Sequence, residues 1–466
     1  MPKCVFTQEH FHWREDRPPR HSWSDTVIYE THVRGFTIHP SSGVEHPGTY
    51  RGLMEKIPYF KELGVTAVEL MPVQEFNEHQ VIGINPQTGH PLRNYWGYDP
   101  VVRDHIYTAL RYWVVEMHID GFRFDLAAVL GRGRSGNLLP NPPLLERIAE
   151  DPILRDVKII AEAWDAAGAY EVGSFSERRW AEWNGQYRDD VRRFWRGDDG
   201  FLGVFAQRIC GSADLYSQSG KGPESSINFV TCHDGFTLHD LVSYRQKHNE
   251  PNGQNNHDVM NENFSENYGA EGETADGQIE SIRKRQIKNF LLTLFISRGV
   301  PMLLGGDEFR RTQGGNNNPY CQDNETSWHD WRCLEQHREI FRFTRGMIAF
   351  RRAHPVLSKE QFYTDAEIRW FGPQGGLPDW ADPKEKQFSC LIHEDEQRAL
   401  CLMFNAGADA VEFGLPPVPP GARWHLAVDT SRQAPQDLFA AGEEPLWENS
   451  KTYRLSPRSG AVLLAR

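Results

Sequence analysis

Three carboxylates, Asp125, Glu162 and Asp234, each follow a short run of apolar or aromatic residues. Such runs are typical of buried strands, and the carboxyl ends of parallel strands meet at one edge of a sheet or one mouth of a barrel. We therefore expect the three side chains to gather in one place, where their charges repel one another. Glycoside hydrolysis uses such a cluster, because it needs one carboxylic acid and one carboxylate across the scissile bond.

The neighbours of two of these carboxylates predict different protonation states. Arg123 and Asp125 lie two positions apart, so on a strand they share one face and form an ion pair. That pairing keeps Asp125 ionised, as a nucleophile requires. Glu162 follows the apolar residues 159–161 and precedes Trp164. An apolar setting raises the pKa of a glutamate, which suits a general acid.

Each of these residues also has a less specific interpretation. A single buried Asp–Arg pair is structural more often than catalytic, and a lone glutamate at the end of a strand carries little information. His233 and Asp234 are compatible with a turn closed by an Asx hydrogen bond. His118, Asp120 and Asp125 offer a set of metal ligands, but such residues often fall this close together by chance. We predict neither a metal nor a cofactor.

Alternating strand and helix patterns place these residues. Strands are predicted over 26–32, 65–71, 121–125, 157–162, 227–232 and 300–304, and helices over 52–63, 103–117, 142–150 and 282–297. Repeated βαβ units imply a parallel sheet, and repetition over about 320 residues favours an α/β fold with a TIM-type (β/α) barrel. Beyond residue 355, short strands between turns rich in proline and glycine predict an antiparallel β-sandwich.

The predicted domains are a lead-in over 1–25, a catalytic barrel over 26–354 and a C-terminal β-sandwich over 355–466. The formal charge of −13 argues against a nucleic-acid partner, which needs a basic face. No stretch approaches the roughly 18 apolar residues of a membrane span, and the start of the chain lacks the apolar run of a secretory signal. Seven scattered cysteines without C-x-x-C spacing indicate reduced thiols in a cytoplasm.

Longer motifs carry a resemblance to a known family. The segments DGFRFDLA (120–127), IIAEAWD (159–165) and FVTCHDG (229–235), in this order, resemble three signature regions of the α-amylase superfamily. The segments VIYETHVRGFT (27–37), NYWGYDP (94–100), HDGFTLHDLVSY (233–244) and GGDEFRRTQGGNNNPYCQDN (305–324) resemble bacterial glycogen-debranching enzymes of the isoamylase type. The similarity covers nearly the whole chain.

The resemblance implies a role for each carboxylate. Asp125 would be the nucleophile that forms a covalent glucosyl intermediate, and Glu162 would act first as general acid and then as general base. Asp234 would hold sugar hydroxyls and favour the distorted, oxocarbenium-like transition state.

The resemblance also implies substrate-binding residues. Arg123 and His233 would support the nucleophile and the bound glucose, while Trp96 and Tyr98 would stack on the sugar. Without the resemblance, a packed loop explains these rings better. The Asn-rich segment 247–273 is the kind of insertion that shapes branch-point specificity in this group, although its composition alone indicates a solvated loop.

The chain departs from the family pattern after NYWGYDP, where Pro100 is followed at once by residues 101–103, VVR. Relatives carry a helix, a third barrel strand and an inserted domain there, and that strand ends in a D-V-V-x-N-H signature that this sequence lacks. We therefore predict a barrel incomplete by one β/α unit of about 30 residues, with seven strands or a rearranged closure. Such a barrel has unsatisfied strand edges. The family's N-terminal carbohydrate-binding β-sandwich is also missing, and Ala163 replaces a frequent proline.

These observations predict a cytoplasmic retaining hydrolase that cleaves α-1,6 branch linkages, with a branched α-glucan such as glycogen or a limit dextrin as its partner. Two alternatives stay open: a catalytically impaired α-glucan-binding protein, and an α-1,4-acting amylase or glucanotransferase. Turnover separates the hydrolase from the first alternative, and linkage analysis of the products separates it from the second.

Overall fold

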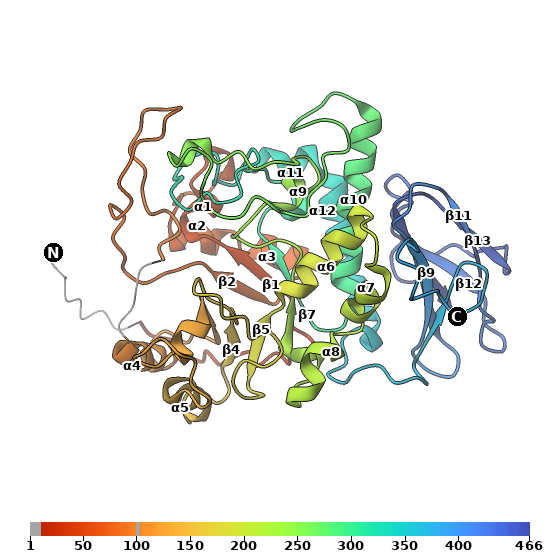
Figure 1. Cartoon of the computed structure of the whole chain (residues 1–466), viewed down its shortest axis with the longest axis horizontal. Helices are drawn as coiled ribbons and strands as arrows, with labels where there is room; N and C mark the ends of the chain where they lie inside the picture. The colour runs from red at the N-terminus through yellow and green to blue at the C-terminus, as the bar shows by residue number, and fades with distance from the viewer. Residues whose placement is uncertain (1–10, 99–102) are drawn as a thin grey trace.

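The computed structural model describes residues 11–98 and 103–466, and the first part of it is an incomplete barrel (Figure 1). Its seven parallel strands are β1 (Ile28–Thr31), β2 (Ala67–Leu70), β3 (Gly121–Phe124), β4 (Lys158–Ala161), β5 (Trp180–Trp183), β6 (Ser226–Asn228) and β7 (Val300–Leu304). They run in the order β2-β1-β7-β6-β5-β4-β3, so β2 and β3 are the two edges of the sheet. The predicted seven-stranded, incomplete (β/α) barrel is confirmed. The predicted junction at Pro100 and Val101 lies outside the described residues.

The inner face of the barrel carries an apolar layer followed by a charged one. In the parallel register of β1 and β2, Ile28 lies opposite Ala67, and two positions further on Glu30 lies opposite Glu69. Residues two apart share a face of a strand, so Glu162, after β4, continues the same alternation. Charged side chains thus collect at the carboxyl end of the barrel, while apolar side chains fill its base.

The helices of the barrel domain are α1 (Val33–Thr37), α2 (Tyr50–Glu55), α3 (Ile57–Leu63), α4 (Arg103–Val115), α5 (Pro143–Glu150), α6 (Gly185–Arg196), α7 (Leu202–Ile209), α8 (Ala213–Tyr216), α9 (Leu238–Leu241), α10 (Gly277–Ile296), α11 (Arg332–Gln336) and α12 (Arg338–Ala353). The single helix predicted over 52–63 is wrong. It is broken between α2 and α3 at Lys56, because Pro58 has no N–H to continue the hydrogen-bond ladder. In the described part of the chain, no helix is both long and apolar enough to cross a membrane.

Two strand predictions also need correction. The strand predicted over 227–232 is shorter in the structure, where only β6, residues 226–228, pairs with its neighbours. The residues that follow make side-chain contacts instead. The hydroxyl of Thr231 donates to Asp307, and the backbone N–H of His233 donates to the carboxylate of Glu30 rather than to a backbone carbonyl. The strand β5 was not predicted, because its buried Glu182 interrupts an otherwise apolar run.

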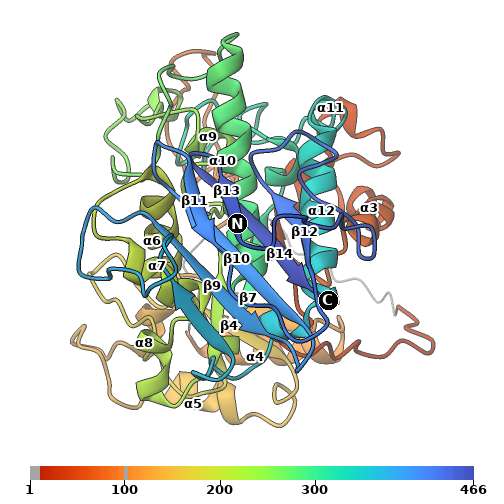
Figure 2. The same cartoon turned by 90° about the vertical axis from the view of Figure 1, so that its right-hand side faces the viewer.

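Antiparallel sheets follow the barrel (Figure 2). Five strands, in the order β12-β14-β10-β9-β8, are β12 (Trp424–Asp429), β14 (Ser459–Ala465), β10 (Ala399–Asn405), β9 (Gln387–His393) and β8 (Ile368–Phe371). The second sheet pairs β11 (Val411–Gly414) with β13 (Thr452–Leu455). Buried residues of both sheets, among them Phe413 and Leu463, form one apolar cluster. The predicted C-terminal antiparallel β-sandwich is confirmed.

The five-stranded sheet packs against the barrel domain through α6, α7 and α10 (Figure 1). The rings of Phe205 on α7 and Phe404 on β10 lie 5.2 Å apart, centroid to centroid. On α10, Asn289 accepts a hydrogen bond from the Thr430 hydroxyl at 2.6 Å. These apolar and polar contacts form one continuous core between the two parts.

Candidate active site

One guanidinium joins two of the predicted catalytic carboxylates. Arg123 on β3 donates from Nη1 to Asp125 Oδ1 at 2.5 Å, and its Nη2 lies 3.1 Å from Glu162 Oε2. The side chains of Arg123 and Glu162 are 6% and 3% exposed, whereas that of Asp125 is 31% exposed. The Arg123–Asp125 pair is therefore present as predicted. The two carboxylates share a counter-ion but differ in their access to solvent.

The environment of Glu162 favours its protonated form. Burial raises the pKa of Glu162 to about 7, and the nearby charge of Asp125 acts in the same direction. Arg123 opposes this rise, as does the backbone N–H of Leu126, which donates to Glu162 Oε2 at 2.6 Å. A substantial fraction of Glu162 thus carries a proton at neutral pH, as the apolar residues before it led us to expect.

His233 is held by a carboxylate that the sequence did not single out. Glu30 on β1 accepts hydrogen bonds from His233 Nδ1 at 2.6 Å and from its backbone N–H at 2.9 Å. Burial works against a charged ring, but Glu30 outweighs it and raises the pKa of His233 to about 9. Asp234 follows directly and is exposed to solvent. His233 is therefore a fixed imidazolium beside an accessible carboxylate.

A second unanticipated glutamate lies beside Glu30. Glu69 on β2 faces it across the parallel register, with both side chains on the inner face of the barrel. Burial, followed by the charge of Glu30, raises the pKa of Glu69 to about 8. Arg123 and His233 oppose that rise, and Glu162 adds to it. The inner face thus holds more carboxyl groups than cations. Protonation of carboxyl groups with a raised pKa, such as Glu69, reduces the excess negative charge.

Two rings of the NYWGYDP segment reach the site. The ring centroids of Trp96 and Tyr98 lie 4.9 Å and 5.4 Å from that of His233, and both side chains are partly exposed. Tyr98 Oη also accepts a hydrogen bond from Arg123 at 3.1 Å. Between the rings, Gly97 has φ +84°, and a Cβ added there would lie 2.9 Å from a phenylalanine ring. The turn that presents both rings therefore requires glycine.

Trp183 at the end of β5 is a further residue missed in the sequence. The Arg123 guanidinium carbon lies 3.8 Å from the centroid of its ring, a cation–π contact that holds the cation from one side. A signal for Glu30 and Glu69 was present, because each is a lone charge inside a short apolar strand. Nothing in the sequence marked Trp183 as a site residue, since a tryptophan in a strand ordinarily belongs to the hydrophobic core.

The Asn-rich segment 247–273 is partly buried. Asp258 is 8% exposed, and its Oδ2 accepts hydrogen bonds from the amides of Asn249, Asn252 and Asn318 at 3.1, 2.9 and 2.9 Å. Amide side chains both donate and accept, so they satisfy one another out of contact with water. The expectation of a solvated loop is therefore wrong for this part of the segment.

The alternative metal set does not assemble at the site. His118 contacts Asp16 at 2.8 Å through Nδ1 and stacks on Trp13, with ring centroids 4.0 Å apart. Asp125 instead contacts Arg123. Among the residues that the structure describes, no group of three or more potential metal-binding side chains occurs.

Comparison with known proteins gives concordant results. A family model described as the C-terminal region of isoamylases 1–3 matches residues 369–461. The chain is 39% identical to "Isoamylase 1, chloroplastic" of Oryza sativa subsp. japonica, over 92% of this chain and 67% of the rice protein. It is 37% identical to the "Glycogen operon protein GlgX homolog" of Mycobacterium tuberculosis, over 90% of this chain and 70% of that protein.

The fold is also similar to that of solved structures. The type I pullulanase of Bacillus subtilis complexed with maltose matches with a TM-score of 0.71 at 20% identity, over 99% of this chain and 72% of the pullulanase. The alignment with the rice protein spans 543 positions, more than the 466 residues of the chain. The rice protein therefore carries residues within the aligned region that have no counterpart here.

Proposed function

The chain belongs to the isoamylase-type debranching enzymes of the α-amylase superfamily, and on that premise we propose that Asp125, Glu162 and Asp234 hydrolyse the α-1,6 branch linkages of glycogen or limit dextrins. It is a glycoside hydrolase that acts on α-1,6 linkages. The observation that carries the residue assignment is the Arg123 guanidinium in contact with both an open and a buried carboxylate.

In the first step Glu162 donates its proton to the oxygen of the α-1,6 linkage, and the branch-point hydroxyl leaves. The Asp125 carboxylate attacks the anomeric carbon from the opposite face and forms a covalent glycosyl ester. Arg123 stabilises Asp125 as an anion before the attack. Because the pKa of Glu162 is raised, its side chain carries the proton that it donates at neutral pH.

In the second step the deprotonated Glu162 accepts a proton from water, which attacks the anomeric carbon and releases Asp125. The configuration of that carbon is retained because it is inverted twice. Asp234 and the neighbouring imidazolium of His233 bind sugar hydroxyls as acceptor and donor. The rings of Trp96 and Tyr98, partly exposed beside His233, stack on a glucose face.

The enzyme is proposed to act in a cytoplasm, where it meets a neutral, branched α-glucan. The net charge of −13 suits an uncharged polymer better than a polyanion. The six cysteines in the described residues are free thiols, in keeping with a reducing compartment.

Activity on branched and linear glucans tests the function directly. Wild-type enzyme is expected to release linear maltooligosaccharides from glycogen limit dextrin, to leave linear amylose intact, and to lose this activity in Asp125→Asn. Linkage analysis of the products then identifies the bond cut. Products from amylose would support an α-1,4-acting enzyme, and glucan binding without turnover in the wild type would support an impaired binding protein.

A further inference from the structure

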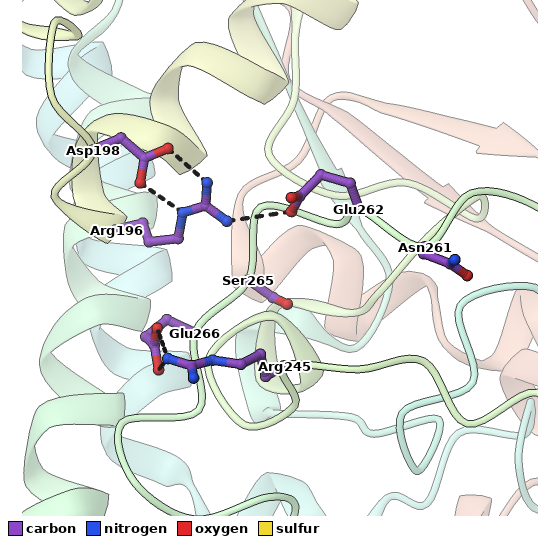
Figure 3. Close-up of a pocket in the computed structure, with 7 residues that line it drawn as sticks. All are labelled: Arg196, Asp198, Arg245, Asn261, Glu262, Ser265 and Glu266. Carbon is purple, nitrogen blue, oxygen red and sulfur yellow. Dashed lines mark hydrogen bonds and ion pairs between the residues drawn. The ribbon is translucent and has the colours of Figure 1, made fainter.

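A polar cavity opens on the surface, and none of the three proposed catalytic carboxylates lines it. It has a volume of about 560 Å³, within the range of ligand sites, and is lined by two arginines, three carboxylates, an asparagine and a serine. They come from the end of α6, the chain after α9 and the segment 261–266 (Figure 3). None of these residues takes part in the mechanism above.

One wall of the cavity is built around Arg196. Its Nε and Nη2 donate to the two oxygens of Asp198 at 2.7 and 2.6 Å, and its Nη1 donates to Glu262 Oε1 at 3.2 Å. The Asp198 side chain is 18% exposed and that of Glu262 is 59% exposed. Asp198 is thus fixed by the arginine, while Glu262 keeps free acceptor capacity toward the cavity.

The facing wall is built around Arg245. Its Nη2 donates to both oxygens of Glu266, at 3.0 and 2.7 Å, while its side chain stays 63% exposed. Backbone N–H groups of Asn267 and Tyr268 hold Glu266 Oε1 at 3.1 and 3.2 Å. Figure 3 shows the two groups of ion pairs facing one another, with Ser265 between them. The ion pairs within each wall, together with the backbone N–H groups that hold Glu266, therefore fix the lining, while the Arg245 side chain stays exposed to a ligand.

The chemistry of this lining selects a class of ligand. The two cations are outnumbered by three carboxylates, and every charge is paired within a wall, so a phosphate or other polyanion finds no free positive charge. The lining offers no apolar platform to a lipid chain. Sugar hydroxyls, which both donate and accept, match fixed pairs of arginine and carboxylate. We propose that this cavity binds a segment of a neutral α-glucan.

The cavity is connected to the catalytic site through one residue. Asn263, in the segment that lines the cavity, accepts a hydrogen bond through Oδ1 from Asn317 Nδ2 at 2.9 Å. The backbone carbonyl of Asn317 accepts the N–H of Gly235 at 3.0 Å, and Gly235 follows Asp234. A glycogen chain long enough to reach both sites gains affinity from the second contact, because that contact is made within one complex, whereas a short maltooligosaccharide binds each site separately. This gain rests on the proposed function.

The test measures binding of maltohexaose by calorimetry in a Glu162→Gln background, where turnover does not consume the ligand. The parent variant is expected to show two binding events. Arg245→Ala is expected to weaken one of them about tenfold, because it removes charge-assisted hydrogen bonds and leaves Glu266 unpaired. Arg398→Ala is the matched control, since its exposed arginine also contacts a carboxylate at 2.7 Å. Thermal melting confirms that each variant is folded.

The outcomes separate this inference from the proposed function. A single binding event in the parent, or equal affinities in Arg245→Ala and Arg398→Ala, would overturn the cavity as a glucan site even if the wild type cleaves limit dextrin. Loss of one event in Arg245→Ala supports the cavity even if the wild type cleaves nothing. Inorganic phosphate and spermine serve as probes of the other ligand classes, and displacement of maltohexaose by either would overturn the assignment to a neutral sugar.

Discussion

In the described residues, β1, β7, β6, β5 and β4 are hydrogen-bonded on both sides and form the closed arc of the barrel, whereas β2 and β3 are its open edges. These two regions hold different parts of the proposed chemistry. Glu30 lies on β1 and Glu162 follows β4, and both strands are hydrogen-bonded on two sides. Arg123 lies on β3 and Glu69 on β2, and within the described residues each of these strands pairs on one side alone. The proposed proton donor and the partner of His233 therefore rest on the continuous sheet, while Asp125, the proposed nucleophile, follows an edge strand.

This difference shows how the side chain proposed as nucleophile can be held in a fixed place although it follows an edge strand. Arg123 contacts Asp125 just after its own strand, Glu162 just after the neighbouring strand β4, and the ring of Trp183 on β5. These side-chain contacts tie the edge strand β3 to the closed arc, although β3 has no backbone hydrogen bonds to a described strand on its other side. Side chains thus replace part of the rigidity that a closed barrel draws from its strands.

The largest expected effect comes from removing the proposed proton donor on the closed arc. Glu162→Gln is expected to lower turnover about a thousandfold, because the amide cannot protonate the leaving oxygen. In the wild type, kcat/KM is expected to fall as pH rises through about 7, since only protonated Glu162 is active. That fall should vanish from the residual activity of the variant. Glu171→Gln is the control, as this half-buried glutamate lies outside the site.

The second largest effect is expected at Arg123, which joins the edge strand β3 to the closed arc. Arg123→Met is expected to lower kcat/KM about a hundredfold, because both carboxylates lose their counter-ion. Steady-state kinetics on limit dextrin measure the loss, and near-ultraviolet circular dichroism checks the fold. Arg132→Met provides the comparison, since Arg132 also pairs with a carboxylate, Asp165, at 2.6 Å. Equal losses in the two variants would contradict a special role for Arg123.

The third effect tests the support of His233. Glu30→Gln is expected to lower kcat/KM about tenfold, because His233 loses the charge that keeps it protonated. NMR titration of the ring should give a pKa well below the wild-type value of about 9. The stability contributed by a raised histidine pKa is complete below about 6.5 and disappears as pH rises through about 9. The wild type should lose stability over that interval, and the variant less; identical curves would exclude this role.

A smaller effect is expected at the open edge. The pKa of Glu69 is raised above the ordinary 4.5 to about 8, so its contribution to stability is complete below about 4.5 and is lost as pH rises through 8. Glu69→Gln stays neutral and is expected to unfold about 1–2 kcal/mol less readily than wild type at pH 9. Urea denaturation at pH 6 and pH 9 measures the difference. Glu62→Gln, at an exposed position, should show none.

The smallest effect needs no substitution. Amide hydrogens of β2 and β3 are expected to exchange faster than those of β6 and β7, because edge strands open locally at lower free energy. Exchange followed by mass spectrometry on peptides from each strand measures this. Equal protection throughout the sheet would mean that the open edges are as firmly held as the closed arc.

Local patterns were sufficient for part of the site. Arg123 and Asp125 could be paired from the sequence because two positions on a strand fix their common face. The raised pKa of Glu162 followed from the apolar residues directly before it. The incomplete barrel was predictable because a recognisable family segment is absent and no long-range contact had to be inferred.

Contacts between distant residues account for what was missed. The Glu30–His233 pair joins positions 203 residues apart, and nothing near either residue points to the other. Glu182 made β5 unlike a buried strand, yet its carboxylate lies 2.5 Å from the Lys221 ammonium, 39 positions further on. A buried charge in a strand is intelligible only when its partner is known.

The position of β14 has a consequence for how the C-terminal sheet is made on the ribosome. β14 lies between β12 and β10, although both are synthesised before it. Until β14 emerges, β10 and β12 each expose an edge, and the sheet that covers α10 is split. The apolar face of α10 therefore stays partly uncovered from its own synthesis until β14 emerges, and it is available to chaperones until this strand is inserted.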